Sequence, residues 1–327
     1  MQKNKRPKPA AFHTRLQRWY DAQGRHDLPW RNTDDPYKIY VSEVMLQQTQ
    51  VETVRTRFYT PFLKRFPTLS ELAAASEQEV LSLWQGLGYY RRAGHLHAAA
   101  KQCGGKLPKT AEGLMQLPGI GRNTAHAIAA FAYHHPVAVM EANVKRVLCR
   151  IFAMPNPSES ELWGKAEMLL NRAAPFDYNQ AMMDLGAMIC TRRAPKCGEC
   201  PASSICEGKG NPESYPQAKV KKKVPVRKRN ILVQVDDRGK FSVTPRSTKF
   251  LQGLYHFTEQ DTPAPKHAKK IGEIEQSYSH FTLQAEVWLV KSRKKNAYSL
   301  AQLQKLPMSM AEKKILRLLA PHGTKRA

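Results

Sequence analysis

The chain has 327 residues, of which 42% are hydrophobic, so a single small domain is excluded and there are enough apolar side chains for two cores. Lysine and arginine number 52 against 27 aspartate and glutamate, a formal net charge of +25. This excess favours a polyanionic partner, with nucleic acid first, although a generally basic, solvated surface would have the same composition. No apolar run of about 18 residues and no signal-peptide pattern is present, so we expect a soluble cytoplasmic protein with no membrane partner.

The first part of the chain has a helical period. After a basic tail over residues 1–10, apolar residues recur at three- and four-residue spacing from Phe12 to Phe176, with Gly, Pro or Asn between the segments. This pattern predicts a mainly α domain over residues 11–206.

A basic stretch that contains prolines then interrupts the period from Glu207 to Arg227. It includes Lys219 and the three lysines at positions 221–223. Such composition is typical of a connection between domains, so we predict a linker over residues 207–226.

Beyond the linker the period changes to two. Residues 231–235 and 241–243 alternate on either side of Asp237-Arg238-Gly239, which predicts a β-hairpin. Alternation returns over 281–290, and a helix is predicted at 310–319. We therefore predict a second, smaller α+β domain over residues 227–327.

Four of the six cysteines lie close together with the spacing C-x6-C-x2-C-x5-C, at Cys190, Cys197, Cys200 and Cys206. Four thiolates at this spacing favour a [4Fe–4S] cluster, while structural zinc and uncoordinated thiols stay open as alternatives. The loop 190–206 also carries Arg192, Arg193 and Lys196, and a cluster would hold these cations toward phosphates. The two separate cysteines, Cys103 and Cys149, are predicted to be ordinary buried thiols.

A second motif predicts a phosphate contact. Leu117-Pro118-Gly119-Ile120-Gly121, followed by Arg122-Asn123-Thr124 and an alanine-rich run, has the pattern of a helix-hairpin-helix element. Gly119 and Gly121 permit positive φ and a close approach of the backbone, and the next helix begins with free N–H groups.

Together with these two motifs, four more segments resemble the MutY adenine DNA glycosylases of the endonuclease III superfamily. The resemblance is dense over about residues 10–206 and thinner in the C-terminal domain. The segments are Leu28-Pro29-Trp30-Arg31 with the run from Val41 to Val51, the run from Trp84 to Tyr90, and the run from Asn179 to Gly186.

The resemblance implies a glycosidic-bond cleavage whose needs can be checked chemically. Loss of adenine creates a poor anionic leaving group and a cation-like sugar, so a proton donor and a negative charge are both required. Glu43 lies among Val44, Met45 and Leu46, where partial burial would raise its pKa. By resemblance Glu43 protonates the adenine ring and then handles water.

The second carboxylate departs from the family pattern. The family has Asp-Gly-Asn-Val, whereas this chain has Glu141-Ala142-Asn143-Val144. We expect Glu141, with Asn143 beside it, to stabilise the sugar cation from a longer side chain. The alternative is a slow or inactive site, since a displacement of about 1 Å at a catalytic group can lower a rate about 100-fold.

Bifunctional relatives carry a lysine directly after the hairpin, and its amine forms a Schiff base with the sugar. The corresponding residue here is Asn123. The resemblance therefore implies a monofunctional enzyme that leaves an abasic site without efficient strand cleavage.

The adenine must leave the helical stack before it can react. By resemblance, Gln48 and Tyr89 separate the stack beside the opposing base. Leu28, Trp30 and Arg31 line the pocket, and Gln180 hydrogen bonds to adenine.

The C-terminal domain resembles the Nudix-like module with which MutY proteins recognise 8-oxoguanine. Tyr278, Ser279 and His280 match a family Phe-Ser-His loop, with tyrosine in place of phenylalanine. The glutamate-rich Nudix signature that binds Mg²⁺ is not present in the sequence, so we expect no nucleotide hydrolysis.

These features lead us to expect a nucleoid-associated, monomeric repair glycosylase that removes adenine opposite 8-oxoguanine or guanine from double-stranded DNA. Two alternatives stay open. One is a DNA-binding protein that has lost catalysis through the change at residues 141–142. The other is a bifunctional glycosylase and lyase.

Overall fold

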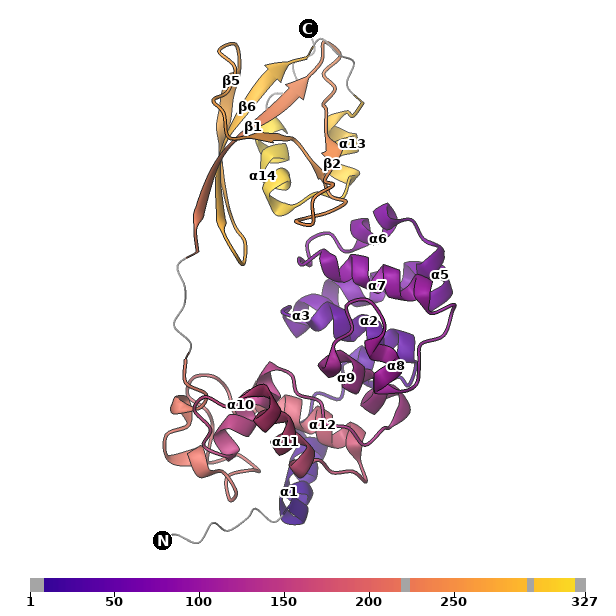
Figure 1. Ribbon diagram of the computed structural model, residues 1–327, viewed down its shortest axis with the longest axis vertical. Coiled ribbons are helices and arrows are strands. Elements are labelled where there is room, and N and C mark those ends of the chain that lie inside the picture. The colour runs from indigo at the N-terminus through magenta and orange to yellow at the C-terminus, as the bar shows by residue number, and fades with distance from the viewer. Residues whose placement is uncertain (1–8, 219–223, 293–296, 321–327) are drawn as a thin grey trace. The chain divides into compact units, whose positions relative to one another are not determined.

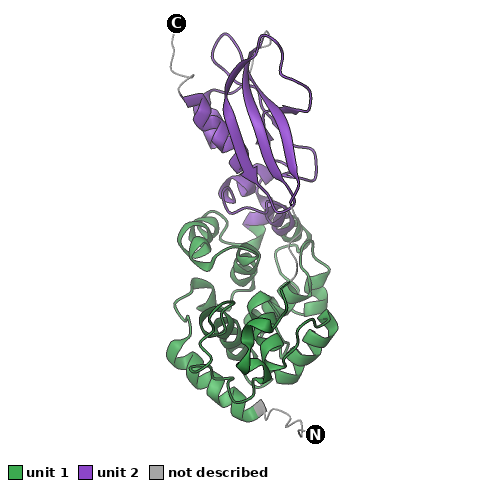
Figure 2. Cartoon of the chain, turned by 90° about the vertical axis from the view of Figure 1, so that its left-hand side faces the viewer, with its two compact units in different colours: residues 1–70, 98–220 green, residues 71–97, 221–327 purple. Residues whose placement is uncertain are grey.

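The computed structural model describes residues 9–218, 224–292 and 297–320 (Figure 1). The basic residues 1–8 of the predicted tail and Lys221, Lys222 and Lys223 of the predicted linker, together with Lys219, lie outside the described residues. The chain divides into two compact units, residues 1–70 with 98–220 and residues 71–97 with 221–327 (Figure 2). We call them unit 1 and unit 2 and describe each by itself.

Unit 1 is helical, as the sequence period predicts. Its helices begin at capping residues: the Asp35 side chain accepts the N–H groups of Tyr37 and Lys38, and Ser158 forms a capping box with Glu161. The α-helices are α1 (Pro9–Gln23), α2 (Pro36–Leu46), α3 (Val51–Thr53), α4 (Tyr59–Arg65), α8 (Ala111–Met115), α9 (Arg122–Tyr133), α10 (Ala142–Ile151), α11 (Glu159–Leu169) and α12 (Pro175–Asp184). Two π-helical segments, η2 (Val54–Phe58) and η3 (Leu185–Ile189), and three 3-10 turns, η1 (Pro29–Arg31), η4 (Glu207–Gly210) and η5 (Pro212–Ser214), complete the described part of the unit.

Two packing arrangements in unit 1 position the site. Helix α2 packs against α9, which is buried along most of its length. Helices α1, α10, α11 and α12 enclose a separate core that includes Phe12, Leu148 and Leu185, each fully buried. The first part of the predicted linker is the two turns η4 and η5, which pack beside α10.

Unit 2 contains α6 (Glu77–Leu83) and the α+β part of the chain, while α5 (Leu69–Ala74) and α7 (Arg91–Gln102) each cross a boundary between the units. The main sheet has the strand order β4-β1-β6-β5. Strands β1 and β6 are parallel, and the other pairs are antiparallel. The elements are β1 (Val226–Val235), β2 (Thr244–Pro245), β3 (Tyr255–His256), β4 (Thr258–Gln260), β5 (Lys269–Ser277), β6 (Thr282–Lys291), α13 (Leu300–Lys305) and α14 (Met310–Leu319).

The alternation over 281–290 and the helix at 310–319 are confirmed as β6 and α14, and α14 packs on one face of the sheet around Val233, Val287 and Ile315 (Figure 1). The predicted hairpin is wrong in part. A turn forms at Asp236 to Lys240, but Val235 and Phe241 make only an isolated bridge. Phe241 pairs on its other side with Tyr298, and the strands that neighbour β1 in the sheet are β4 and β6. Local turn chemistry therefore formed the bend, and tertiary pairing selected the strands.

Candidate active site

Two carboxyl groups share one site in unit 1. Glu43 is half-buried on α2, and Glu141 precedes α10 as its N-cap residue. Burial, and then the negative charge of Glu141, raise the pKa of Glu43 to about 7, while the Arg31 guanidinium acts in the opposite direction. Coulomb effects of this kind need short separations, so the three groups lie around one site.

Glu141 is held by the first turn of its own helix. Its Oε1 accepts the N–H of Val144 at 3.1 Å, and the backbone and side chain of Asn143 also hydrogen bond to it. Burial raises the pKa of Glu141, while these hydrogen bonds and the charge of Arg146 oppose the rise. The longer side chain therefore still reaches a helix N-terminus, where a carboxylate is stabilised.

Two asparagines fix the backbone that leads into Glu141. Asn123 Oδ1 accepts the N–H of Met140 at 2.7 Å, and Asn179 Oδ1 accepts the N–H of Val139 at 2.9 Å. Asn123, predicted as a DNA contact, thus has an intramolecular bond. Asn179 was missed, although it stands beside Gln180 in a motif that the sequence singled out.

Arg31 is buried against a second carboxylate. Its Nη1 and Nη2 donate to Asp184 at 2.7 and 2.8 Å, and Arg25 donates to the same side chain. Although burial favours the neutral acid, the bonds and charge of Arg31 and Arg25 hold the pKa of Asp184 below its usual range. Among the described residues, the buried Nε of Arg31 has no partner. Asp184 was missed; a lone acid within the apolar run 181–185 was the available signal.

Arg146 links this site to the cysteine loop. Its Nη2 donates to Asn143 Oδ1 at 2.8 Å and to the Gly186 carbonyl at 2.7 Å, and its Nε donates to the Cys190 carbonyl at 2.8 Å. A Cβ at Gly186 would lie 2.6 Å from the Cβ of Asn143, so only glycine permits this approach.

The four clustered cysteines line one pocket, together with Arg150. The Arg150 side chain is only 2% exposed, and its Nη1 donates to Cys190 Sγ at 3.3 Å and to the Thr191 carbonyl at 2.6 Å. Burial and then the neighbouring cysteines raise the pKa of Cys206 to about 11. Cysteines 103, 149, 190, 197, 200 and 206 are free of disulfides. Within the described ranges, no group of three or more His, Cys, Asp or Glu side chains is arranged to hold a metal ion.

The two glycines of the hairpin differ. Gly119 has φ of 75°, whereas Gly121 has φ of −88° and is the extended N-cap of α9. Positive φ, which both glycines permit, is therefore adopted at Gly119 and not at Gly121. A Cβ at Gly121 would meet nothing within 4 Å, and no side chain caps the first N–H groups of α9.

The other predicted residues of unit 1 are split between interior and surface. Leu28, Trp30 and Gln180 are buried, and Trp30 packs edge-on against Tyr59. Gln48, Arg192 and Arg193 are exposed, and Gln48 has φ of 54°.

In unit 2, Tyr89 is 47% exposed on a turn of unusual backbone conformation. Its φ is 50°, and Gly86 and Gly88 have φ of 98° and 83°. An exposed aromatic side chain held in this sparsely populated conformation is a candidate for a functional contact.

The predicted lesion-reading loop is also in unit 2. Ser279 and His280 are exposed, whereas Tyr278 is half-buried and its N–H donates to the Phe281 carbonyl at 2.8 Å. The Phe250 ring contacts Tyr278 and His280 edge-on, each at 5.1 Å between centroids. The aromatic contacts hold the loop, while the exposed Ser279 and His280 side chains hydrogen bond to each other at 3.3 Å.

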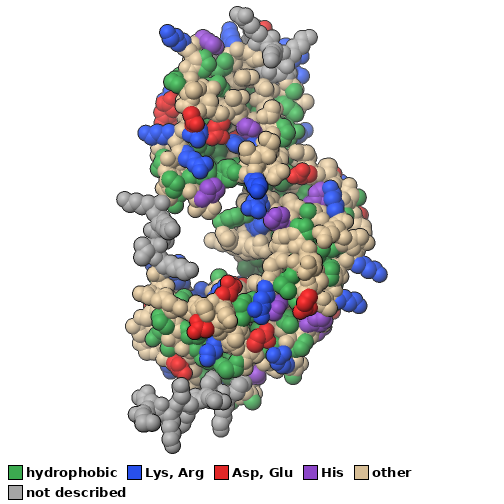
Figure 3. Space-filling model, viewed as in Figure 1, with side chains coloured by type: hydrophobic (Ala, Val, Ile, Leu, Met, Phe, Trp, Pro, Cys, Tyr) green, Lys and Arg blue, Asp and Glu red, His purple; other side chains and the backbone are tan. Residues whose placement is uncertain are grey.

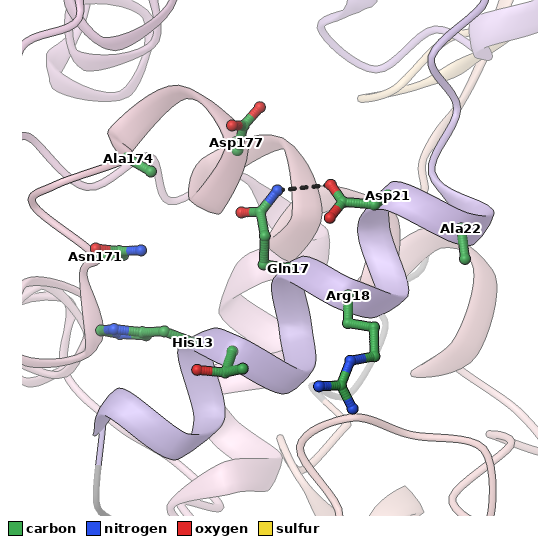
Figure 4. A pocket seen from close by; sticks show the side chains of 9 residues that line it. His13, Gln17, Arg18, Asp21, Ala22, Asn171, Ala174 and Asp177 are labelled. Atoms are coloured by element: carbon green, nitrogen blue, oxygen red, sulfur yellow. Dashed lines mark hydrogen bonds between the residues drawn. The ribbon is translucent and has the colours of Figure 1, made fainter.

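A further pocket of about 780 Å³ lies between α1 and the start of α12. Figure 4 shows His13, Gln17 and Asp21 along α1, with Gln17 donating to Asp21 at 2.8 Å. None of the predicted site residues lines this pocket, so it is separate from the carboxyl pair. In the part of the chain that the structure describes, no helix has the length and apolarity needed to cross a membrane.

Comparisons with known proteins identify the family of the chain. Residues 41–172 match the family "HhH-GPD superfamily base excision DNA repair protein". The chain is 33% identical over 297 residues to an adenine DNA glycosylase of Buchnera aphidicola. The matched region covers 83% of this chain and 85% of that protein. It is 46% identical over 217 residues to the human adenine DNA glycosylase, covering 61% of this chain but only 39% of the human protein.

Solved structures share the helical fold. A thermostable thymine-DNA glycosylase superposes with a TM-score of 0.58 at 29% identity, over 62% of this chain and 97% of its own. An endonuclease III in a non-covalent DNA complex superposes with a TM-score of 0.54 at 19% identity, over 63% and 98% of the two chains.

Proposed function

Because the chain belongs to the adenine DNA glycosylase family, we propose that it hydrolyses the N-glycosidic bond of adenine in duplex DNA where the opposite base is 8-oxoguanine or guanine. The observation that carries the proposal is the pair of carboxyl groups at Glu43 and Glu141. One has a pKa of about 7 and can hold a proton near neutrality, and the other is stabilised by a helix N-terminus.

The pair supplies both halves of the reaction. Glu43 donates its proton to the adenine ring, and the electron pair of the C–N bond then leaves with a neutral base. The sugar becomes an oxocarbenium ion, which the Glu141 carboxylate stabilises from its fixed position. Water adds to the anomeric carbon and returns a proton to Glu43, which leaves an abasic site.

Strand cleavage does not follow efficiently, because the position of the Schiff-base lysine is Asn123. Its amide has no nucleophilic amine, and its oxygen holds Met140. The proposed enzyme is monofunctional.

DNA contacts are distributed over both units. Gln48 and Tyr89 separate the stacked bases, and Leu28, Trp30, Arg31 and Gln180 form the pocket of the extruded adenine. Tyr278, Ser279 and His280 of a Nudix-like domain read the 8-oxoguanine, for which two exposed hydrogen-bonding side chains are suitable.

The fold also offers phosphate contacts. The Gly119 and Gly121 hairpin presents the N–H groups of α9, and Arg192 and Arg193 are exposed on the cysteine loop. Cys190, Cys197, Cys200 and Cys206 would hold a [4Fe–4S] cluster, since they line one pocket without disulfides. When bound, the cluster supplies rigid cross-linking of the loop, and no step of base removal passes through it.

A duplex with adenine opposite 8-oxoguanine tests the activity, with strand breaks read before and after hot alkali. We expect breaks only after alkali, and none with Glu43→Gln. Breaks before alkali would identify a lyase, and DNA binding without any break would identify a protein that has lost catalysis.

A reversion tests the role of Glu141. Glu141→Asp combined with Ala142→Gly restores the family residues, and we expect it to change single-turnover excision by no more than about 100-fold. If the native chain is inactive while the reverted chain excises adenine, Glu141 does not replace aspartate.

A further inference from the structure

The two elements of unit 2 proposed to face the opposing base meet one short segment. These elements are the turn 84–90, which carries Tyr89, and the loop 278–280. The segment consists of residues 306–309, between α13 and α14, and we call it the anchor segment. All contacts described below lie within unit 2.

The turn reaches the anchor segment from both sides of Tyr89. Gln85 Nε2 donates to the carbonyls of Leu306 at 3.0 Å and Met308 at 3.4 Å. The Tyr90 hydroxyl donates to the same Met308 carbonyl at 3.5 Å and accepts the N–H of Gly86 at 3.3 Å. These bonds brace a turn in which three residues have positive φ.

The loop reaches the next residue of the anchor segment. The Tyr278 side chain packs against the core that contains Met308 of the anchor segment, and its hydroxyl is placed to hydrogen bond with the side chain of Ser309. Ser309 is 2% exposed, caps α14 and hydrogen bonds to Glu312, which Arg246 holds at 3.4 Å. The bond depends on the hydroxyl that distinguishes Tyr278 from the phenylalanine of the Phe-Ser-His pattern.

We propose that the anchor segment fixes the position of the Tyr89 turn relative to the Tyr278 loop. Gln85 and Tyr278, the latter through its hydroxyl, are then positioning residues for recognition of the opposing base. The inference rests on the proposed function. Its physical basis is that the Tyr89 turn and the Tyr278 loop are both bonded to one buried segment, so their positions are coupled. Removing the bonds of either element therefore lowers the selectivity of both for the opposing base.

Binding to intact substrate measures this selectivity. The full chain carrying Glu43→Gln is titrated with duplexes that pair adenine with 8-oxoguanine or with guanine. We expect Gln85→Ala and Tyr278→Phe each to lower the affinity ratio for the two duplexes by about fivefold. Because both act through one segment, the double variant should lose little more than the stronger single variant.

Gln284→Ala is the matched control, because Gln284 lies on β6 and donates to the Glu275 side chain of the neighbouring strand β5 at 2.9 Å, a bond that does not involve the anchor segment. It should leave the ratio unchanged. Thermal unfolding of every variant shows whether a lower affinity ratio results only from destabilisation of the fold. An unchanged ratio in both single variants, or fully additive losses, would overturn the proposal.

Hydrogen exchange separates this proposal from the proposed function. In free protein, Tyr278→Phe should speed amide exchange in residues 84–92, although the substitution lies in another segment. If exchange there is unchanged, the anchor proposal fails. If exchange responds while the parent protein shows no preference for 8-oxoguanine, the anchor stands as a structural coupling and the assignment of lesion reading fails.

Discussion

At the scale of single residues, the proposed reaction depends on the protonation states of two glutamates. Glu43 must carry a proton, and its pKa is about 7 because of burial and the nearby Glu141. Glu141 must be ionised, and burial raises its pKa from the usual value. The two requirements define a window between the two pKa values.

We therefore predict a bell-shaped pH profile for single-turnover adenine excision. Above about pH 7 the rate constant should fall about tenfold per pH unit as Glu43 loses its proton. In acid it should fall again as Glu141 becomes protonated. A profile that stays flat from about pH 6 to about pH 9 would contradict the assignment of Glu43 as the acid.

Protein stability supplies a control that needs no DNA. Since the folded pKa of Glu43 lies above its unfolded value of 4.5, the folded state binds more protons between the two values, and stability falls as pH rises through that window. Glu43→Gln should recover on the order of 2–3 kcal/mol of unfolding free energy at about pH 8 and little at about pH 4.5.

At the scale of elements, α10 joins the candidate site to the cysteine loop. Its N-cap is Glu141, its first turns contain Asn143 and Arg146, and its last turn contains Arg150. Arg146 and Arg150 are four residues apart, so both side chains lie on one helix face and reach the loop that begins at Cys190.

Arg150→Met should therefore disrupt the loop. The Arg150 guanidinium donates hydrogen bonds to the carbonyls of Cys190, Thr191 and Arg192. Its removal leaves these acceptors without donors. We expect a loss of about 3 kcal/mol in unfolding free energy and a lower content of bound iron and sulfide. The control is Lys145→Met, because the Lys145 side chain is 40% exposed and pairs only with the exposed Glu159, at 3.5 Å. Equal iron content in both variants would contradict the role of Arg150.

Most elements could be predicted from sequence because their signals are local. The three- and four-residue period gave the helices, and alternation over 281–290 gave β6. The partnership of Arg31 with Asp184 could not be predicted, because 153 residues separate them and a lone acid in an apolar run does not say which cation it pairs with. The partners of β1 were missed for the same reason. Gly121 shows a further limit: a glycine permits positive φ without requiring it.

The candidate site was predictable to a different degree. The resemblance predicted Glu43 and Glu141 as the catalytic pair, and the effect of the Glu141 charge on the pKa of Glu43 indicates only that the two groups are near each other. The supporting residues Asn179, Arg146 and Arg150 were missed, because a buried polar side chain is recognised as structural only when its backbone partners are known.

At the scale of the whole molecule, charge sets the dependence of DNA binding on salt. The net charge is +25, and Figure 3 shows lysine and arginine side chains spread over the visible faces of both units rather than gathered in one patch. A protein that neutralises several phosphates releases counterions, so its affinity should fall steeply as salt concentration rises.

Arg192 and Arg193 should account for a measurable share of that slope, because both are exposed on the cysteine loop. Each contact to a phosphate contributes about 0.9 to the slope of log K against log salt concentration, so Arg192→Ala and Arg193→Ala should each lower its magnitude by about 1. The matched control is Arg238→Ala, because Arg238 is paired with Asp236 at 2.9 Å. The loss should be equal for duplexes with 8-oxoguanine and with guanine, since phosphates carry no base identity. A base-dependent loss would show that the loop arginines do more than neutralise the DNA backbone. An equal effect of Arg238→Ala would show that they do not contact it.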